Sequence, residues 1–173
     1  MKSLNGIKDV YFTHSFVLGA FPCELKDNKT GVKFVLPVKD IQSFQLEHPN
    51  FGSYWVGVSA IFSNFGSAGL DITNDAAGLS IICPQTQHSS QSGADRGQLY
   101  FFSRKSFDAD HFIDTTFGEE RMRILTYGLV NKNIIFYIAN SQCQPVVVKS
   151  SGFDYTGCSL IVTLARSRTV LGV

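Results

Sequence analysis

Residues 134–139 read Ile-Ile-Phe-Tyr-Ile-Ala, residues 160–165 read Leu-Ile-Val-Thr-Leu-Ala, and these two stretches decide the fold class. Both are short and almost wholly apolar, and neither alternates apolar with polar residues. An apolar run of this length is typical of a strand that is covered on both faces. We therefore expect both stretches to be central strands of a sheet.

The remaining apolar runs predict further strands, several with one wet face. Fifteen Phe and six Tyr lie in runs that Gly, Asn, Asp, Ser and Pro interrupt, without a helical period. Near the N-terminus, apolar Phe12 and Phe16 alternate with polar Thr13 and Ser15. Together these patterns predict strands near residues 10–18, 32–38, 41–46, 54–62, 70–73, 79–82, 99–103, 122–130, 134–139, 146–149 and 159–165.

Polar stretches between these strands predict turns and little helix. Residues 27–31 and 131–133 hold Asn, Asp or Gly where a tight reversal needs positive φ, so both predict hairpin loops. Residues 106–113 predict one short helix, and residues 118–122 predict a further turn. The sequence shows no β-α-β rhythm and no internal repeat.

The fold class that follows is all-β. We expect an antiparallel two-sheet sandwich, of the jelly-roll or a similar Greek-key type, with at most one or two short helices. A length of 173 residues is enough for one hydrophobic core, so residues 1–173 are predicted to form a single β-sandwich domain.

Composition excludes several classes of protein. Hydrophobic residues make up 44% and charged residues 17% of a chain whose formal net charge is +1, so wholesale disorder and a polybasic nucleic-acid binder are both excluded. No apolar run is long enough to cross a bilayer, and Lys2, Asn5 and Lys8 interrupt the N-terminus where an export signal would be hydrophobic. We therefore predict a chain made in the cytoplasm, without a membrane span.

The four cysteines, which lie far apart in the chain, are predicted to be buried free thiols: Cys23, Cys83, Cys143 and Cys158. The C-terminal stretch 155–173 carries Arg166 and Arg168 and no acid. We interpret this pair as surface arginines and expect no nucleic-acid partner. The apolar ending at residues 169–173 predicts docking on the chain's own domain or on a neighbour.

No standard catalytic or metal-binding motif is present, so we predict a protein that is not an enzyme, with no catalytic residues, no metal and no cofactor. Cys83 and His88 have the residue types of a thiolate and its base, but Cys83 ends an apolar run and is expected to be buried. Among the acidic residues, Asp108, Asp110 and Asp114 with His111 form one dense cluster, which we interpret as helix capping instead of calcium binding.

The polar stretch 84–98 contains no large apolar residue and therefore predicts a surface loop. Long loops in compact domains are often functional. His88, Asp95 and Arg96 are its candidate contact residues, for a partner, a ligand or another subunit. A plain solvated connection between sheets is the alternative.

Trp55 is the single tryptophan, and its strand is amphipathic. Tyr54, Val56, Val58, Ala60 and Phe62 share one predicted core face, which leaves Trp55 with Gly57, Ser59 and Ile61 on the other. We take Trp55 and Tyr54 as the candidate interface or ligand aromatics. Three roles remain open for Trp55: a sugar platform, a subunit contact or a core residue.

The function expected from these features is structural. We predict a virion-type protein, such as a capsid, vertex or spike subunit, that is made in the host cytoplasm and acts by homo-oligomeric self-association. Burial of apolar surface between copies would close rings such as a pentamer or a trimer, beside other virion proteins. The alternative is a carbohydrate- or receptor-binding β-sandwich module whose partner is a glycan or receptor.

Overall fold

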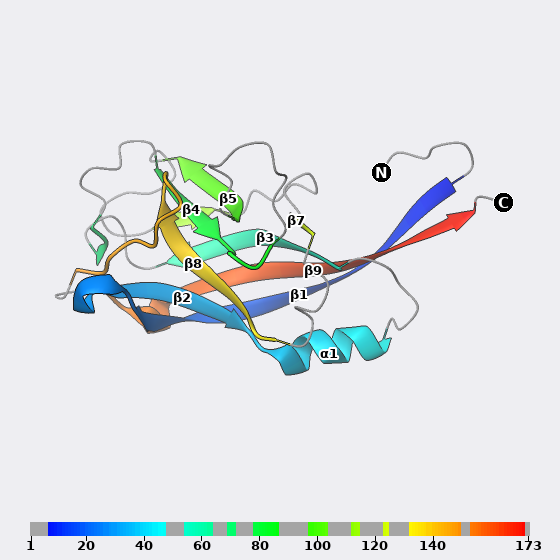
Figure 1. Ribbon diagram of the computed structural model, residues 1–173, viewed down its shortest axis with the longest axis horizontal. Coiled ribbons are helices and arrows are strands. Elements are labelled where there is room, and N and C mark those ends of the chain that lie inside the picture. The colour runs from blue at the N-terminus through cyan, green and yellow to red at the C-terminus, as the bar shows by residue number, and fades with distance from the viewer. Residues whose placement is uncertain are drawn as a thin grey trace.

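A computed structural model describes residues 7–47, 54–63, 69–71, 78–86, 97–103, 112–114, 123–124, 132–149 and 153–171. Its elements, most of which are labelled in Figure 1, are β1 (Ile7–Glu24), η1 (Lys26–Asn28), β2 (Thr30–Leu36), α1 (Val38–Glu47), β3 (Tyr54–Ser63), β4 (Gly78–Ile82), β5 (Gln98–Ser103), β6 (Phe112–Asp114), β7 (Arg123–Ile124), β8 (Ile134–Asn140), η6 (Tyr155–Gly157) and β9 (Cys158–Leu171). The protein is thus mostly antiparallel β, as the sequence predicts.

The strands form one hydrogen-bonded sheet in the order β5-β4-β8-β2-β1-β9-β3-β6, and β7 also pairs with β3. The order from β5 to β3 contains seven strands. The first and the last of these, β5 and β3, also contact each other, so the sheet curls nearly into a barrel. The predicted two-sheet sandwich is not confirmed, because the strand ladder is continuous from one half to the other.

Strand β1 makes this continuity possible. It pairs with β9 over residues Ile7 to Gly19 and with β2 over residues Ala20 to Glu24, so one long strand belongs to both halves of the sheet. At its end the chain reverses through η1, where Asp27 and Asn28 adopt positive φ angles of 61° and 56°. The predicted hairpin loop at residues 27–31 is therefore confirmed.

Both stretches that decided the fold class are central strands, as predicted. Strand β8 lies between β4 and β2, and β9 lies between β1 and β3. Their inward side chains join the core inside the curled sheet, where side chains such as Phe34, Phe136, Ile138, Leu160 and Val162 are fully buried.

The strand predicted at residues 41–46 is wrong, because this stretch lies in helix α1. Ile41 and Phe44 are both buried, and a spacing of three places them on one face of a helix but on opposite faces of a strand. Pro37 immediately precedes the helix, and the backbone N–H of Val38 donates to Asn133 Oδ1 at 2.9 Å. Tertiary contacts thus decide a segment whose pattern is ambiguous.

The predicted faces of the strand at residues 54–62 are correct for its first half only. A bulge between Val58 and Ala60 shifts the register against β9. Beyond the bulge the faces exchange, so Ile61 is fully buried and Phe62 is 37% exposed. The prediction that Phe62 belongs to the core and Ile61 to the opposite face is therefore wrong.

Several shorter predictions are met in part. Of the strands predicted at residues 70–73 and 146–149, the structure shows one isolated bridge, between Leu70 and Val148, and residues 72 and 73 lie outside the described residues. A second isolated bridge joins Ala139 and Pro145. The strand predicted at residues 122–130 is met by the short strand β7, and the other residues of this range lie outside the described residues. Among the described residues no strand pairs across the turn predicted at residues 131–133.

The predicted helix at residues 106–113 lies mostly outside the described residues, but its last two residues, Phe112 and Ile113, belong to strand β6. The turn predicted at residues 118–122 lies wholly outside them. Within the described ranges, no helix has the length and apolar character needed to cross a membrane.

Strands β1 and β9 continue beyond the rest of the sheet as a two-stranded ribbon (Figure 1). Tyr54, the first residue of β3, pairs with Arg166 of β9, whereas the β1–β9 ladder continues to the pair Ile7 and Leu171. We call residues 7–12 and 166–171 the arm. The predicted docking of the C-terminal stretch on its own domain is met here by backbone pairing with β1.

Candidate functional surface

The most distinctive surface of the described residues lies on the outer face of β1, β9 and β3. Side chains alternate along each strand, so the residues that do not face the core form rows across the three strands. One row joins Val17, Ile161 and Ala60, and the next joins Gly19, Ser159 and Phe62. Apolar residues therefore lie side by side on the outside of the sheet.

Exposure identifies the residues that are open to a partner. Val17 is 71% exposed, Phe21 is 54% exposed and Phe62 is 37% exposed, while Ile161 between β1 and β3 is half-buried. We call these four residues the outer patch. No acidic or basic residue lies in the two rows described above, and Lys33 of the neighbouring β2 pairs with Phe21.

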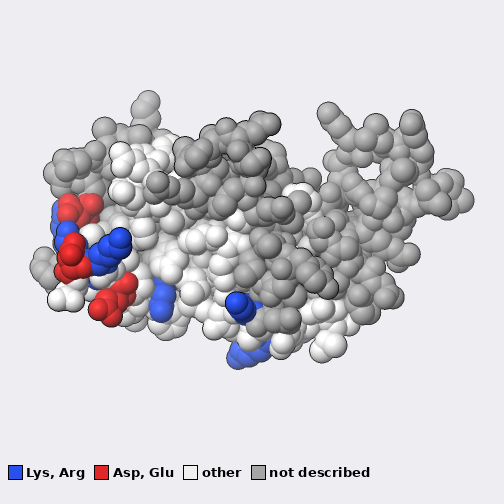
Figure 2. Space-filling model, in the orientation of Figure 1, with Lys and Arg blue, Asp and Glu red and all other residues white. Residues whose placement is uncertain are grey.

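Charged side chains gather elsewhere. Figure 2 shows acidic and basic residues concentrated at the end of the molecule that carries the turn between β1 and β2. Glu24, Lys26, Asp27 and Lys29 are all exposed there. Charge of both signs at this end favours water, so the apolar outer patch, which Lys33 borders at Phe21, is the better surface for contact with another apolar surface.

A row of hydroxyl groups borders the outer patch. The Thr163 hydroxyl is hydrogen-bonded to the Ser59 hydroxyl, and it lies 3.0 Å from the Ser15 hydroxyl. Thr163 is buried, whereas Ser15 is exposed. The row therefore links three strands and presents one end to solvent.

The two candidate aromatics lie on opposite faces of β3. Trp55 is half-buried on the outer face, opposite Ala165 of β9 and two residues from the position paired with Thr163. Tyr54 is 8% exposed and lies in the core, where its ring centroid is 6.5 Å from that of Phe44. Of this pair, Trp55 is therefore the residue beside a surface.

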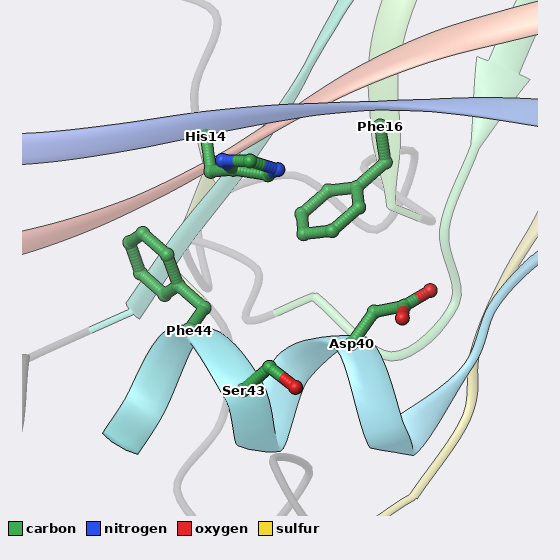
Figure 3. A pocket seen from close by; sticks show the side chains of 5 residues that line it. All are labelled: His14, Phe16, Asp40, Ser43 and Phe44. Carbon is green, nitrogen blue, oxygen red and sulfur yellow. The ribbon is translucent and has the colours of Figure 1, made fainter. Parts of the chain in front are cut away.

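A second feature is a shallow pocket between β1 and α1, of about 180 Å³, which Figure 3 shows. His14 and Phe16 point from β1 toward the helix, and Asp40, Ser43 and Phe44 line the opposite side. The His14 and Phe16 rings are 4.6 Å apart and tilted by 60°, so the histidine packs on an aromatic neighbour.

This pocket contains the residue types of a serine-histidine-aspartate triad without its geometry. The Ser43 hydroxyl donates to the Lys39 carbonyl at 3.0 Å, a bond within its own helix. Among the described residues, no hydrogen bond joins His14 to Ser43 or to Asp40. A nucleophile needs its base within hydrogen-bonding reach, so we do not assign catalysis to this pocket.

The cysteine thiols are all free, as predicted. Cys83, Cys143 and Cys158 are buried, whereas Cys23 is half-buried. Burial raises the pKa of the Cys83 thiol to about 12, against the opposing effect of hydrogen bonds with the backbone of Gln85 and Thr86. Cys83 is therefore a protonated and poorly nucleophilic thiol at neutral pH.

The candidate loop residues His88, Asp95 and Arg96 lie outside the described residues. The described start of that loop is a turn that continues from β4, in which the Thr86 hydroxyl donates to the Cys83 carbonyl at 2.9 Å. Gln85 joins this turn to β8, since its side chain accepts from the Ile135 N–H at 2.7 Å. The role of the loop stays a prediction.

The acidic cluster is also mostly outside the described ranges. Asp108, Asp110 and His111 are not described, and Asp114 lies in β6 opposite Ile61. Within the described part of the chain, no group of three or more His, Cys, Asp or Glu residues could hold a metal ion.

The alternation in β1 carries a signal for the outer patch, because Val17 and Phe21 continue the series of Thr13 and Ser15 on the wet face. No comparable signal exists for Phe62, whose face depends on the bulge.

Comparison with known proteins finds no matching family model, no matching curated protein and no matching solved structure.

Proposed function

We propose that this chain is a structural subunit of a virion, such as a capsid, vertex or spike protein, that acts by associating with copies of itself. The outer patch is the observation that supports this proposal. Val17 is 71% exposed and Phe21 is 54% exposed on one strand, beside Ile161 and Phe62 on the next two. An exposed apolar surface on a sheet, with Lys33 beside Phe21 at its border, is suited to a permanent contact.

The energetics favour repeated contacts over a single one. A patch of about 400 Å² supplies about 10 kcal/mol when it is covered, at about 25 cal/mol per Å². Association costs about 4–15 kcal/mol, so one such contact is weak by itself. A closed ring, such as a trimer or a pentamer, is the assembly that we propose: the outer patch of each copy would contact a different surface of the next copy, so every copy would take part in two contacts.

The proposal also specifies where the protein works. The chain would be made in the cytoplasm of the host and become part of the virion, with other virion proteins as further neighbours. In this setting the exposed charges near the turn between β1 and β2 would face solvent, while the outer patch is covered.

The test is the size of the protein in solution and its dependence on Val17. We expect light scattering to show an oligomer for the wild-type chain. For Val17→Lys, the protein concentration at which the oligomer dissociates to monomer should rise at least about tenfold. A buried lysine lacks a counter-charge in this contact, whereas Val17→Thr keeps the β-branched shape and serves as the matched control.

Circular dichroism should give the same spectrum for all three proteins, because position 17 is outside the core. A wild-type chain that stays monomeric at about 1 mM, the weak limit of specific association, would contradict the proposed function. Equal association of the Val17→Lys and Val17→Thr variants would show that the outer patch is not the surface through which the copies associate.

A glycan- or receptor-binding module is the second candidate function, and the position of Trp55 favours it. An aromatic ring beside a row of hydroxyl groups provides a stacking platform and polar contacts for a sugar. In that case Trp55→Ala should abolish binding on a glycan array without changing assembly, while Trp55→Phe retains part of it. Unchanged binding by Trp55→Ala would exclude this role for Trp55.

A further inference from the structure

The inference concerns the pocket between β1 and α1, whose lining is graded from exposed to buried. His14 and Ser43 are exposed, Phe16 and Asp40 are half-buried, and Phe44 is buried. Together these residues line a space of about 180 Å³, and Figure 3 shows them around one hollow between strand and helix. The pocket can therefore be reached from solvent, and its most buried wall is an aromatic ring.

Three of the five lining side chains are rings. His14 and Phe16 lie on one face of β1, and their ring centroids are 4.6 Å apart with the planes inclined by 60°. Phe44 approaches from the opposite side, on α1. The face of an aromatic ring attracts a cation that lies within about 6 Å of the ring centroid. Rings on two sides of a small hollow are thus suited to a positively charged group.

A carboxylate completes this arrangement. Asp40 lies in the first turn of α1, and Figure 3 shows its side chain rising from the helix toward β1. Among the described residues, no hydrogen bond or ion pair involves the Asp40 carboxylate, and the bond of this residue is that of its backbone N–H with the Pro37 carbonyl. A half-buried carboxylate attracts a cation more strongly than a fully solvated one, because less water screens it.

The position of Asp40 has a structural use as well. An acid in the first turn stabilises the helix through its dipole. That use accounts for the acid, but it does not account for three rings beside it. A bound cation accounts for both.

The lining also selects the kind of cation. A primary ammonium group has three N–H donors, and each needs an acceptor in place of the water that it loses. Asp40 is the one acid among the five lining residues, and the Ser43 hydroxyl already donates to the Lys39 carbonyl at 3.0 Å. A quaternary ammonium group has no N–H, so its methyl groups can contact the rings while its charge faces the carboxylate.

We propose that this pocket binds a trimethylammonium group, with the Asp40 carboxylate as its counter-charge and the rings of Phe16 and Phe44 as its walls. Free choline and the headgroup of phosphatidylcholine both carry this group. Side chains alternate along β1, so Val17 of the outer patch lies on the face opposite to His14 and Phe16. The site is therefore independent of the proposed function.

The test is calorimetric titration of the full-length protein with choline chloride. We expect a dissociation constant of about 1 mM, as befits a ligand with few atoms. Asp40→Asn keeps the shape of the side chain and removes its charge, so it should weaken binding at least about tenfold. Glu24→Gln removes one negative charge from an exposed position at the end of β1. This matched control should bind choline as the wild type does.

Phe16→Leu tests the aromatic wall without changing the first turn of the helix. Leucine keeps an apolar side chain but has no ring, so choline binding should weaken about fivefold or more. Circular dichroism should show that each variant is folded at the temperature of the titration.

Two further ligands separate a cation site from a merely apolar one. In the neutral analogue of choline a tert-butyl group replaces the trimethylammonium group, and in ethanolamine a primary ammonium replaces it. Both should bind at least about tenfold more weakly than choline, the first because it has no charge and the second because its N–H donors lack acceptors.

Vesicles identify the source of the trimethylammonium group. Co-sedimentation with phosphatidylcholine vesicles but not with phosphatidylglycerol vesicles, reversed by free choline, would assign the lipid headgroup. Binding of choline without binding to vesicles would assign a small molecule. Both results support the site.

Three results would overturn the proposal. The first is an absence of choline binding at concentrations up to about 20 mM. The second is binding of the neutral analogue or of ethanolamine as tight as that of choline. The third is equal binding of choline by the wild type, Asp40→Asn and Phe16→Leu.

Discussion

Cys83 shows how a single residue couples burial to pH. It follows β4 directly and its side chain is fully buried, so the neutral thiol is favoured in the folded protein. Burial raises the pKa of this thiol from 9.0 to about 12. The unfolded chain has no such environment, and its thiol ionises from about pH 9.

We expect this difference to lower the free energy of unfolding as pH rises. The contribution of Cys83 is fully present below pH 9, falls by about 1.4 kcal/mol per pH unit above it, and is lost by about pH 12. Urea unfolding at pH 8 and pH 10 measures it. Cys83→Ala is the reference, because Tyr137 and Tyr155, whose pKa values burial also raises, remain in both proteins.

The variant should have a shallower decline between the two pH values than the wild type has. Equal declines would show that Cys83 titrates in the folded protein as it does in the unfolded chain.

At the scale of elements, the glycines of β1 and β2 provide a matched pair. An added Cβ at Gly31 of β2 would lie 2.9 Å from Leu25 Cδ1 and 3.1 Å from Cys23 Sγ. An added Cβ at Gly19 of β1 would meet no atom within 4 Å. The same substitution therefore has opposite expected effects in two paired strands.

We expect Gly31→Ala to lower the free energy of unfolding by about 1–3 kcal/mol, because the packed neighbours must move. We expect Gly19→Ala to raise it by about 0.4–1 kcal/mol, because alanine reduces the freedom of the unfolded chain at a position with open space. Urea unfolding midpoints at low protein concentration measure both effects. A loss of stability in both variants would contradict the open surroundings of Gly19.

The elements also show where sequence patterns succeed and fail. Residues 134–139 and 160–165 are central strands, as predicted from their apolar runs. The predicted cover on both faces is met only in part, because Ile135, Tyr137 and Ile161 on their outer faces are half-buried. Residues 41–46 fit a strand and a helix equally well. The hydrogen bond at the start of the helix joins Val38 to Asn133, which is 95 residues away in sequence, so the local pattern does not report it. The bulge in β3 has no marker in its sequence, so Phe62 could not be assigned to the outer patch.

At the scale of the whole molecule, class was predictable and architecture was not. Alternation reports whether a strand has a covered face, but it does not report that β1 belongs to both halves of one sheet. The predicted sandwich and the observed nearly closed barrel bury the same kinds of strand. Val17 and Phe21 could be recognised as outward residues, whereas their proximity to Phe62 depends on the pairing of three distant segments.

That pairing also predicts slow folding. Ile7 pairs with Leu171, and β9 must lie between β1 and β3 before the core is complete. Contacts between such distant segments carry a large entropic cost of loop closure. A circular permutant with the native ends joined, and with new ends opened between the exposed residues Ser141 and Gln142, makes the β1–β9 pairing local.

We expect the permutant to refold about tenfold faster than the wild-type chain. Stopped-flow fluorescence of Trp55, the single tryptophan, measures both rates. An unchanged rate would mean that β1 and β9 pair after the slowest step of folding.

The side-by-side course of β1 and β9 has a mechanical consequence. A tether that pulled on the two strands at Ile7 and Leu171 would load the same end of one antiparallel ladder. Force in this direction breaks the backbone hydrogen bonds between the strands one pair after another, and does not load all of them in shear at once. Tension applied at these two points would therefore peel the ribbon back at low force, while a load across the barrel would meet many rungs at once.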